Sequence, residues 1–84
     1  MTDNYFKTLK GEFIQNYLNH YLILKDIDVL AYDWGYRIRA VTKLNDFIII
    51  IDIDNNNDNV EELCYNALSK IKTKIIEHYI NPHL

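Results

Sequence analysis

Apolar residues near both ends of the chain recur at helical spacing. From Phe6 onward they follow one another at steps of three and four residues, the period of one helix face: Phe6, Leu9, Phe13, Ile14, Tyr17, Leu18 and Tyr21. The pattern predicts a helix from Asp3 to about His20, with Thr2 or Asp3 as its N-cap.

A longer apolar stripe of the same period follows the asparagine-rich segment 55–59. Its members are Val60, Leu63, Cys64, Ala67, Leu68, Ile71, Ile75 and Tyr79. Asp58 and Glu61 have the spacing of a capping box, with aspartate in the place of serine or threonine. Because Pro82 cannot continue a helix, the stripe predicts a helix that starts near Val60 and ends before this proline.

The middle third of the chain alternates between apolar and polar residues, as strands do. We take Trp34-Gly35 and Asn45-Asp46 as two-residue hairpin turns, because glycine, asparagine and aspartate favour such turns. Side chains that are all apolar except for Thr42 then gather on one face of a three-stranded sheet: Ile27, Val29, Ala31, Ile38, Ala40, Thr42, Leu44, Phe47, Ile49, Ile51 and Ile53. Opposite charges pair across the strands on the other face: Arg39 with Asp52 and Arg37 with Asp54. A shift of one residue would destroy both patterns.

These elements predict a single α+β domain over residues 1–84. Its element order is α-β-β-β-α, a two-layer fold in which a three-stranded antiparallel meander carries two helices on one face. The chain has 84 residues and is 49% hydrophobic, so it can build one core. A chain of this length buries only about 60% of its unfolded surface, which leaves little room for a deep catalytic cleft.

Charge and cysteine content narrow the function classes further. Nine Lys and Arg against twelve Asp and Glu give a formal net charge of -3, whereas nucleic-acid-binding domains usually carry a basic excess. The single cysteine, Cys64, excludes an intramolecular disulfide framework and a cysteine-based zinc site. It lies on the apolar stripe of the second helix, so we expect a buried, unreactive thiol.

Neither a membrane span nor a secretory signal is expected. The longest strictly apolar run, Phe47–Ile51, is far shorter than the roughly 18–20 residues of a membrane span. The N-terminal residues lack the charged and then apolar build of a signal peptide. We therefore expect a soluble cytoplasmic protein.

No group of residues predicts an active site or a cofactor site. The three histidines are dispersed along the chain, and two glycines cannot build a phosphate-binding loop. Segment 52–58 begins like a calcium loop, but Asn57 stands where the loop needs glycine and Leu63 where it needs glutamate. We expect no enzyme activity, no cofactor and no metal site, although the Asn/Asp loop leaves weak metal binding open.

The predicted sheet leaves one apolar patch without cover. Ile48 and Ile50 point to the open face beside Leu30 and Val41, and we assign these four residues to a sheet-face or dimer interface. The strand that carries the two isoleucines is an edge strand, whose unpaired backbone groups invite pairing or coverage. A helix or a tail of the same chain is the alternative cover.

An acidic corner forms where the last strand leads into the second helix. It holds Asp52, Asp54, Asp58, Glu61 and Glu62. Acidic residues at a helix start interact favourably with the helix dipole, which is the structural interpretation of the cluster. Carboxylates on a small rigid domain can also imitate a phosphate backbone and occupy a basic groove of a protein partner.

The element order over Asp3 to Tyr79, together with the Asn-Ala-Leu-Ser-Lys segment 66–70, resembles the double-stranded-RNA-binding domain. That family reads phosphates with a Gly- and Lys-rich start of its second helix. This chain has Asn57, Asp58, Glu61 and Glu62 at those positions. RNA binding is therefore not carried over from the resemblance.

The same order, the small size and the acidic corner also resemble the compact anti-CRISPR proteins of phages and mobile elements, some of which block Cas9 by imitating its DNA. The resemblance implies that the five acidic residues contact a basic nucleic-acid channel on a partner such as a Cas effector. For a phage-encoded protein, this contact would take place in the cytoplasm of the host cell. We therefore expect a small non-catalytic inhibitor of a nucleic-acid-processing or defence enzyme, acting through the acidic corner, the open sheet face, or both. The alternatives are a structural or regulatory homodimer formed through the apolar third strand and, third, a double-stranded-RNA-binding-like domain.

Overall fold

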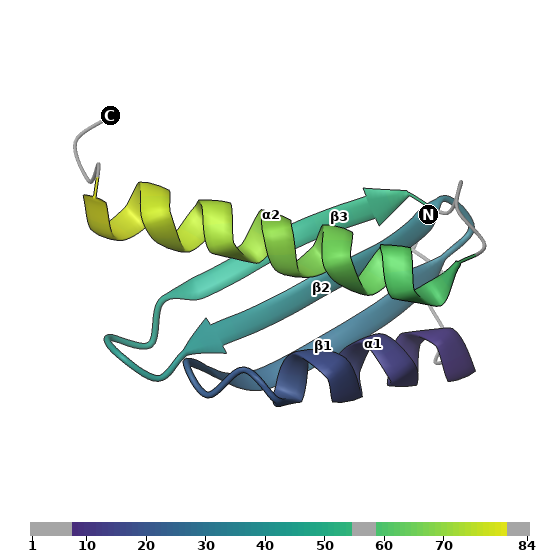
Figure 1. The fold of residues 1–84 in the computed structure, drawn as a ribbon, viewed down its shortest axis with the longest axis horizontal. Helices are drawn as coiled ribbons and strands as arrows, with labels where there is room; N and C mark the ends of the chain where they lie inside the picture. Colours follow the sequence, from purple (N-terminus) through teal and green to yellow (C-terminus); the bar gives the residue numbers. More distant parts are fainter. Residues whose placement is uncertain (1–7, 55–58, 81–84) are drawn as a thin grey trace, which may run out of the picture.

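The chain folds in the predicted order α-β-β-β-α, an α+β fold (Figure 1). The computed structural model describes residues 8–54 and 59–80. Its elements are helix α1 (Leu9–Asn19), strands β1 (Leu24–Tyr32), β2 (Gly35–Thr42) and β3 (Ile48–Asp54), and helix α2 (Val60–Ile80). The strands form an antiparallel sheet in the order β1-β2-β3, and both helices lie on the same face of it.

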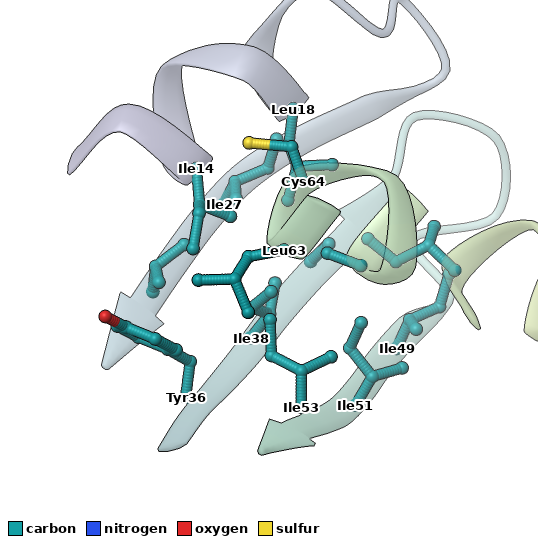
Figure 2. Close-up of a cluster of buried hydrophobic side chains, with 14 of the residues drawn as sticks. Ile14, Leu18, Ile27, Tyr36, Ile38, Ile49, Ile51, Ile53, Leu63 and Cys64 are labelled. Atoms are coloured by element: carbon teal, nitrogen blue, oxygen red, sulfur yellow. The ribbon is translucent and has the colours of Figure 1, made fainter. Parts of the chain in front are cut away.

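One face of the sheet and the inner sides of both helices form the hydrophobic core (Figure 2). Burial alternates along β3 residue by residue, as a strand with one covered face requires. All five elements contribute buried side chains: Ile14, Leu18, Leu24, Ile27, Val29, Ala31, Tyr36, Ile38, Ala40, Ile49, Ile51, Ile53, Leu63, Cys64, Ala67 and Ile71. The predicted burial of the Cys64 thiol is confirmed.

Helix α1 begins at Leu9, later than predicted, because Thr8 caps it. The Thr8 backbone is extended, and its hydroxyl accepts a hydrogen bond from Gly11 N at 2.9 Å. This is the geometry of an N-cap residue. The caps that the sequence predicted, Thr2 and Asp3, lie outside the described residues.

Helix α2 has its cap at Asn59. The Asn59 side-chain oxygen accepts a hydrogen bond from Glu61 N at 3.0 Å, which satisfies one of the backbone donors that a helix start leaves open. Asp58 and Pro82, the predicted capping residue and helix stop, lie outside the described residues.

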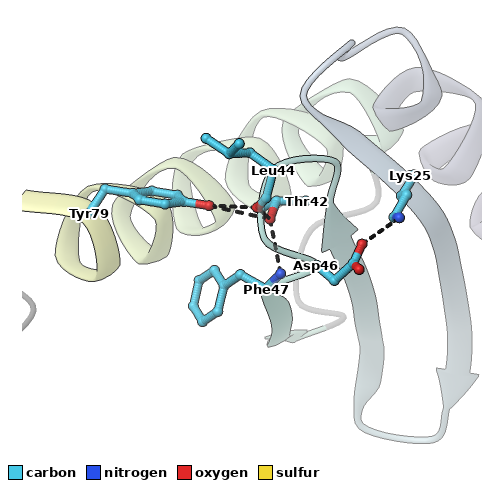
Figure 3. Close-up of polar contacts among 6 residues, drawn as sticks. All are labelled: Lys25, Thr42, Leu44, Asp46, Phe47 and Tyr79. Carbon is cyan, nitrogen blue, oxygen red and sulfur yellow. Dashed lines mark hydrogen bonds and ion pairs between the residues drawn. The ribbon is translucent and has the colours of Figure 1, made fainter.

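A buried hydroxyl ties the C-terminal end of α2 to the loop between β2 and β3 (Figure 3). Thr42 is fully buried; its Oγ1 donates to Leu44 O at 2.7 Å and accepts from Phe47 N at 3.1 Å. Tyr79 OH donates to the same Leu44 carbonyl at 2.9 Å. The His78 ring stacks on the Phe47 ring with centroids 3.7 Å apart. These contacts fix the end of α2 over the start of β3.

Replacing Thr42 by valine is expected to lower the free energy of unfolding by about 1–3 kcal/mol, because Phe47 N loses its acceptor while the side-chain volume is kept. Urea denaturation measures the change. Thr73→Val is the control, since Thr73 is exposed on α2 and bonds only Ser69 O in its own helix. Equal losses of stability in the two variants would contradict the assigned role of the Thr42 hydroxyl.

The pairing across the first hairpin is shifted by two residues from the prediction, although the turn itself moves by only one. Tyr32 pairs with Gly35, so the turn holds Asp33 and Trp34 instead of Trp34 and Gly35. Gly35 has a φ of +150°, and a Cβ atom there would lie 2.1 Å from Ile53 O. Glycine is therefore required in β2, where its backbone lies against β3, and not in the turn.

The second connection is a loop over residues 43–46, longer than the predicted two-residue turn. Thr42 N donates to Phe47 O at 2.9 Å and closes the loop. Asn45 and Asp46 both adopt positive φ angles, 69° and 51°. Because the pairing of both hairpins is shifted by two residues, the paired strand residues keep their predicted faces while their cross-strand partners change. Leu44, predicted on the covered face, instead lies in the loop and is 64% exposed.

Strand β1 contains a bulge that the sequence analysis did not predict. The register shifts between Lys25 and Asp28, and Asp26 has a φ of 53°. The extra residue lets Leu24 and Ile27 both reach the covered face, where each is 4% exposed. Aspartate tolerates this left-handed conformation better than most residues.

Candidate functional site

The open face of the sheet carries the apolar residues that the sequence assigned to an interface. Ile48 and Ile50 are 51% and 55% exposed, whereas Leu30 is half-buried and Val41 is buried. Val41 is shielded because Lys25 and Ile48 flank it across the two neighbouring strands. In residues 8–54 and 59–80, no helix or loop lies over this face. The exposed apolar area of the face therefore comes mainly from the two isoleucines of β3.

Ion pairs surround these isoleucines, with partners that differ from those predicted. Arg37 donates hydrogen bonds to both carboxylate oxygens of Asp52, at 2.9 and 3.1 Å. Arg39 Nη1 lies 3.4 Å from Asp28 Oδ2. The predicted pairs of Arg39 with Asp52 and Arg37 with Asp54 are wrong, because the register of β2 against β3 is shifted by two residues. The hydrogen bonds from Arg37 hold the pKa of Asp52 below its ordinary value. Asp52 therefore stays charged at neutral pH.

An aromatic stack at the hairpin between β1 and β2 extends the face. The Tyr32 and Trp34 rings are stacked with centroids 5.1 Å apart, and the Arg37 guanidinium lies 5.9 and 5.6 Å from the two ring centroids. Trp34 is 45% exposed. Tryptophan, tyrosine and arginine are the residues that contribute most binding energy at protein interfaces. Sequence analysis missed this group, although Tyr32 ends β1, Trp34 lies in the turn that follows, and Arg37 lies on the same open face of the sheet.

The outer edge of β3 presents backbone groups to the surroundings. Phe47 O is bonded to β2, and backbone groups of an antiparallel strand point alternately to one side and the other. The N–H and C=O groups of Ile48, Ile50 and Asp52 therefore point away from β2. Lys70 Nζ of α2 donates to Asp52 O at 2.7 Å and occupies that carbonyl. Within the described chain, no hydrogen bond uses the outward groups of Ile48 and Ile50.

A groove runs between this edge and α2. It has a volume of about 370 Å³ and is lined by Ile50, Ile51, Asp52, Ser69, Lys70, Thr73, Lys74 and Glu77. The strand contributes two isoleucines and Asp52, while the helix contributes polar and charged side chains. Figure 1 shows that the C-terminal half of α2 extends past β3, on the side away from β2.

The acidic corner is less negative than its residue count implies. Glu61 and Glu62 are exposed in the first turn of α2, and Asp54 is exposed at the end of β3. Asp52 is paired with Arg37, and Lys70 lines the same hollow as Asp52 and Asp54. Asp58 lies outside the described residues. The carboxylates that no described cation pairs with are those of Glu61 and Glu62, both on the helix.

In the part of the chain that the structure describes, the cysteine and histidine side chains do not come together in one cluster. Cys64 is buried, and burial raises the pKa of its thiol, which disfavours the nucleophilic thiolate. The His20 ring bonds Asn16 O at 2.8 Å, and His78 stacks on Phe47. His83 lies outside the described residues, as does most of the Asn/Asp loop. Among the described residues, no three His, Cys, Asp or Glu side chains come together as metal ligands would.

Neither described helix combines the length and the apolar character that crossing a bilayer requires. Comparison with known proteins found no matching family model, no matching curated protein and no matching solved structure. The function is therefore inferred from the side chains and backbone groups of the surface itself.

Proposed function

We propose that the chain is a non-catalytic protein-binding domain that inhibits a nucleic-acid-processing or defence enzyme by covering part of its surface with the open sheet face. The observation that carries the proposal is the pair of half-exposed isoleucines, Ile48 and Ile50, on a face that no described element covers. Exposed apolar groups surrounded by polar ones are typical of interaction sites. The Tyr32–Trp34–Arg37 stack adds aromatic and guanidinium groups of the kind that anchor partners.

The charge distribution supports an enzyme that handles nucleic acid as the partner. Such enzymes present basic surfaces to their substrates, and Glu61 and Glu62 lie exposed at the start of α2 beside the end of β3. Complementary charge of this kind speeds association and favours the correct partner more than it adds affinity. In this proposal the isoleucines and the aromatic stack supply the affinity, and the acidic residues steer the encounter.

Ile48→Lys and Ile50→Lys are expected to reduce partner binding at least about tenfold, because each places a charge in the apolar centre of the contact. Ile76→Lys is the matched control: Ile76 is 51% exposed, as Ile48 is, but lies on α2 away from the sheet face. Quantitative affinity capture from cells of the native host compares the proteins that the parent chain and the three variants retain. Retention of the same proteins in the same amounts by all four would remove the proposal.

A further inference from the structure

The outer edge of β3 has the features of a site for one more strand. The outward N–H and C=O groups of Ile48 and Ile50 have no partner in the described chain, and exposed strand edges pair readily with other strands. The groove of about 370 Å³ beside the edge is bounded on its far side by α2. Peptides that bind by strand addition use main-chain hydrogen bonds for affinity and the groove walls for specificity.

We propose that an extended peptide segment of the partner adds to β3 as a fourth strand, in the groove between β3 and α2. The inference rests on the proposed function, since it specifies how a protein partner is held. It names a surface that the sheet-face contact does not use, namely the strand edge and the α2 wall. Lys70 already occupies Asp52 O, so the new hydrogen bonds are confined to the groups of Ile48 and Ile50.

The two walls of the groove set the composition of this peptide. Side chains of a strand alternate between the two faces of a sheet. Those on the open face would lie beside the exposed Ile48 and Ile50, where apolar side chains fit best. Those on the other face would meet the α2 wall, which carries Lys70 and Lys74 and, further along the helix, Glu77. Acidic side chains fit the part of the wall that holds the two lysines. The matching peptide therefore alternates apolar and acidic residues.

A second copy of the chain fits the edge less well than a peptide does. In the β3 strand of a second copy, the side chains on the α2 side are Ile49 and Ile51, which are buried in that copy's own core. A second copy paired edge to edge would therefore bring no acidic side chain of this strand to Lys70 and Lys74. Its own α2 would also lie on the same side of the joined sheets, where the C-terminal half of α2 already extends past β3 (Figure 1). A single strand brings no helix with it.

The test uses a synthetic peptide of about six residues, a typical strand length, in which valine and aspartate alternate. A control peptide carries lysine in place of aspartate. Titration into the isotope-labelled full chain is followed by amide NMR shifts. The acidic peptide is expected to shift the amides of Ile48, Ile50 and the α2 segment 70–77, and to bind at least about tenfold more tightly than the basic one. Absence of saturable binding, or equal affinity for both peptides, would overturn the proposal.

Variants separate the edge from the helix wall. Lys74→Glu is expected to weaken binding of the acidic peptide and to strengthen binding of the basic one. Lys72 lies on the side of α2 that faces Tyr21, so Lys72→Glu is expected to leave the affinity for both peptides unchanged. Ile50→Pro removes the outward N–H at an edge position where proline is tolerated and should abolish binding of both peptides; thermal unfolding verifies that this variant is folded. Peptide binding that survives Ile50→Pro in the folded chain would contradict strand addition.

The two proposals fail separately. If Ile50→Lys and Ile48→Lys release the captured partner while the peptide never binds, the sheet-face function stands and strand addition is wrong. If the peptide binds the edge as expected but no captured protein depends on the isoleucines, the sheet-face function is wrong.

Discussion

Replacing Gly35 by alanine is expected to remove a large part of the chain's stability. The new Cβ atom would lie 2.1 Å from Ile53 O and 2.8 Å from Asp54 Cα, so the backbones of β2 and β3 would have to move apart. The φ angle of +150° adds strain, because it suits glycine and not residues with a side chain. We expect a loss of more than about 3 kcal/mol from a total stability of about 4–13 kcal/mol for a chain of this length.

Gly11→Ala is the control for this substitution. A Cβ atom at Gly11 would meet Thr8 Oγ1 at 3.2 Å and Val29 Cγ1 at 3.6 Å, a tight but tolerable fit against side chains. The gain in helix propensity, about 1 kcal/mol, offsets the tight contact, so stability should change by less than about 1 kcal/mol. Circular dichroism and urea denaturation of both variants measure the difference. A Gly35→Ala chain as stable as the parent would show that β2 and β3 do not meet in this register.

An alanine series along β3 is expected to alternate between large and small losses of stability. Ile49 and Ile51 are 2% and 4% exposed, and replacing either by alanine should cost about 2–5 kcal/mol through lost burial and a new cavity. Ile48 and Ile50 are half-exposed, and the same substitution there should cost less than about 1 kcal/mol. Four neighbouring isoleucines thus divide into two that hold the fold and two that do not.

Urea denaturation of the four single variants under one set of conditions gives the comparison directly. Equal losses at all four positions would mean that both faces of β3 are buried in the folded chain. That result would take away the exposed patch on which the proposed function depends, even though the order of helices and strands would be unchanged.

The order of elements and the faces of the sheet could be predicted because they depend on hydrophobic periodicity alone. An apolar stripe of period 3.6 or 2 identifies an element and its buried face even when the neighbouring turn is slightly misplaced. The register could not be predicted in this way, since a shift of two residues leaves every face unchanged. What decides it is the fit of Gly35 against Ile53 O, a contact between residues distant in the sequence.

In the candidate site too, the features that depend on alternation could be predicted and those that depend on the register could not. The exposure of Ile48 and Ile50 follows from alternation and was predicted, whereas the shielding of Val41 depends on its cross-strand neighbours. The stack of Tyr32, Trp34 and Arg37 and the pair of Arg37 with Asp52 both depend on the register. The bulge at Asp26 has no apolar signal, because it consists of one extra polar residue with a positive φ.

The most direct test of the central claim, that the open face of β3 binds a protein partner, is photo-crosslinking in cells of the native host. A photoreactive phenylalanine analogue is placed at position 50 in one chain and at position 76 in another, since both residues are about half-exposed isoleucines on different surfaces. We predict a discrete crosslinked protein from position 50 and none from position 76. No crosslink from position 50, or the same crosslink from both positions, would contradict the account.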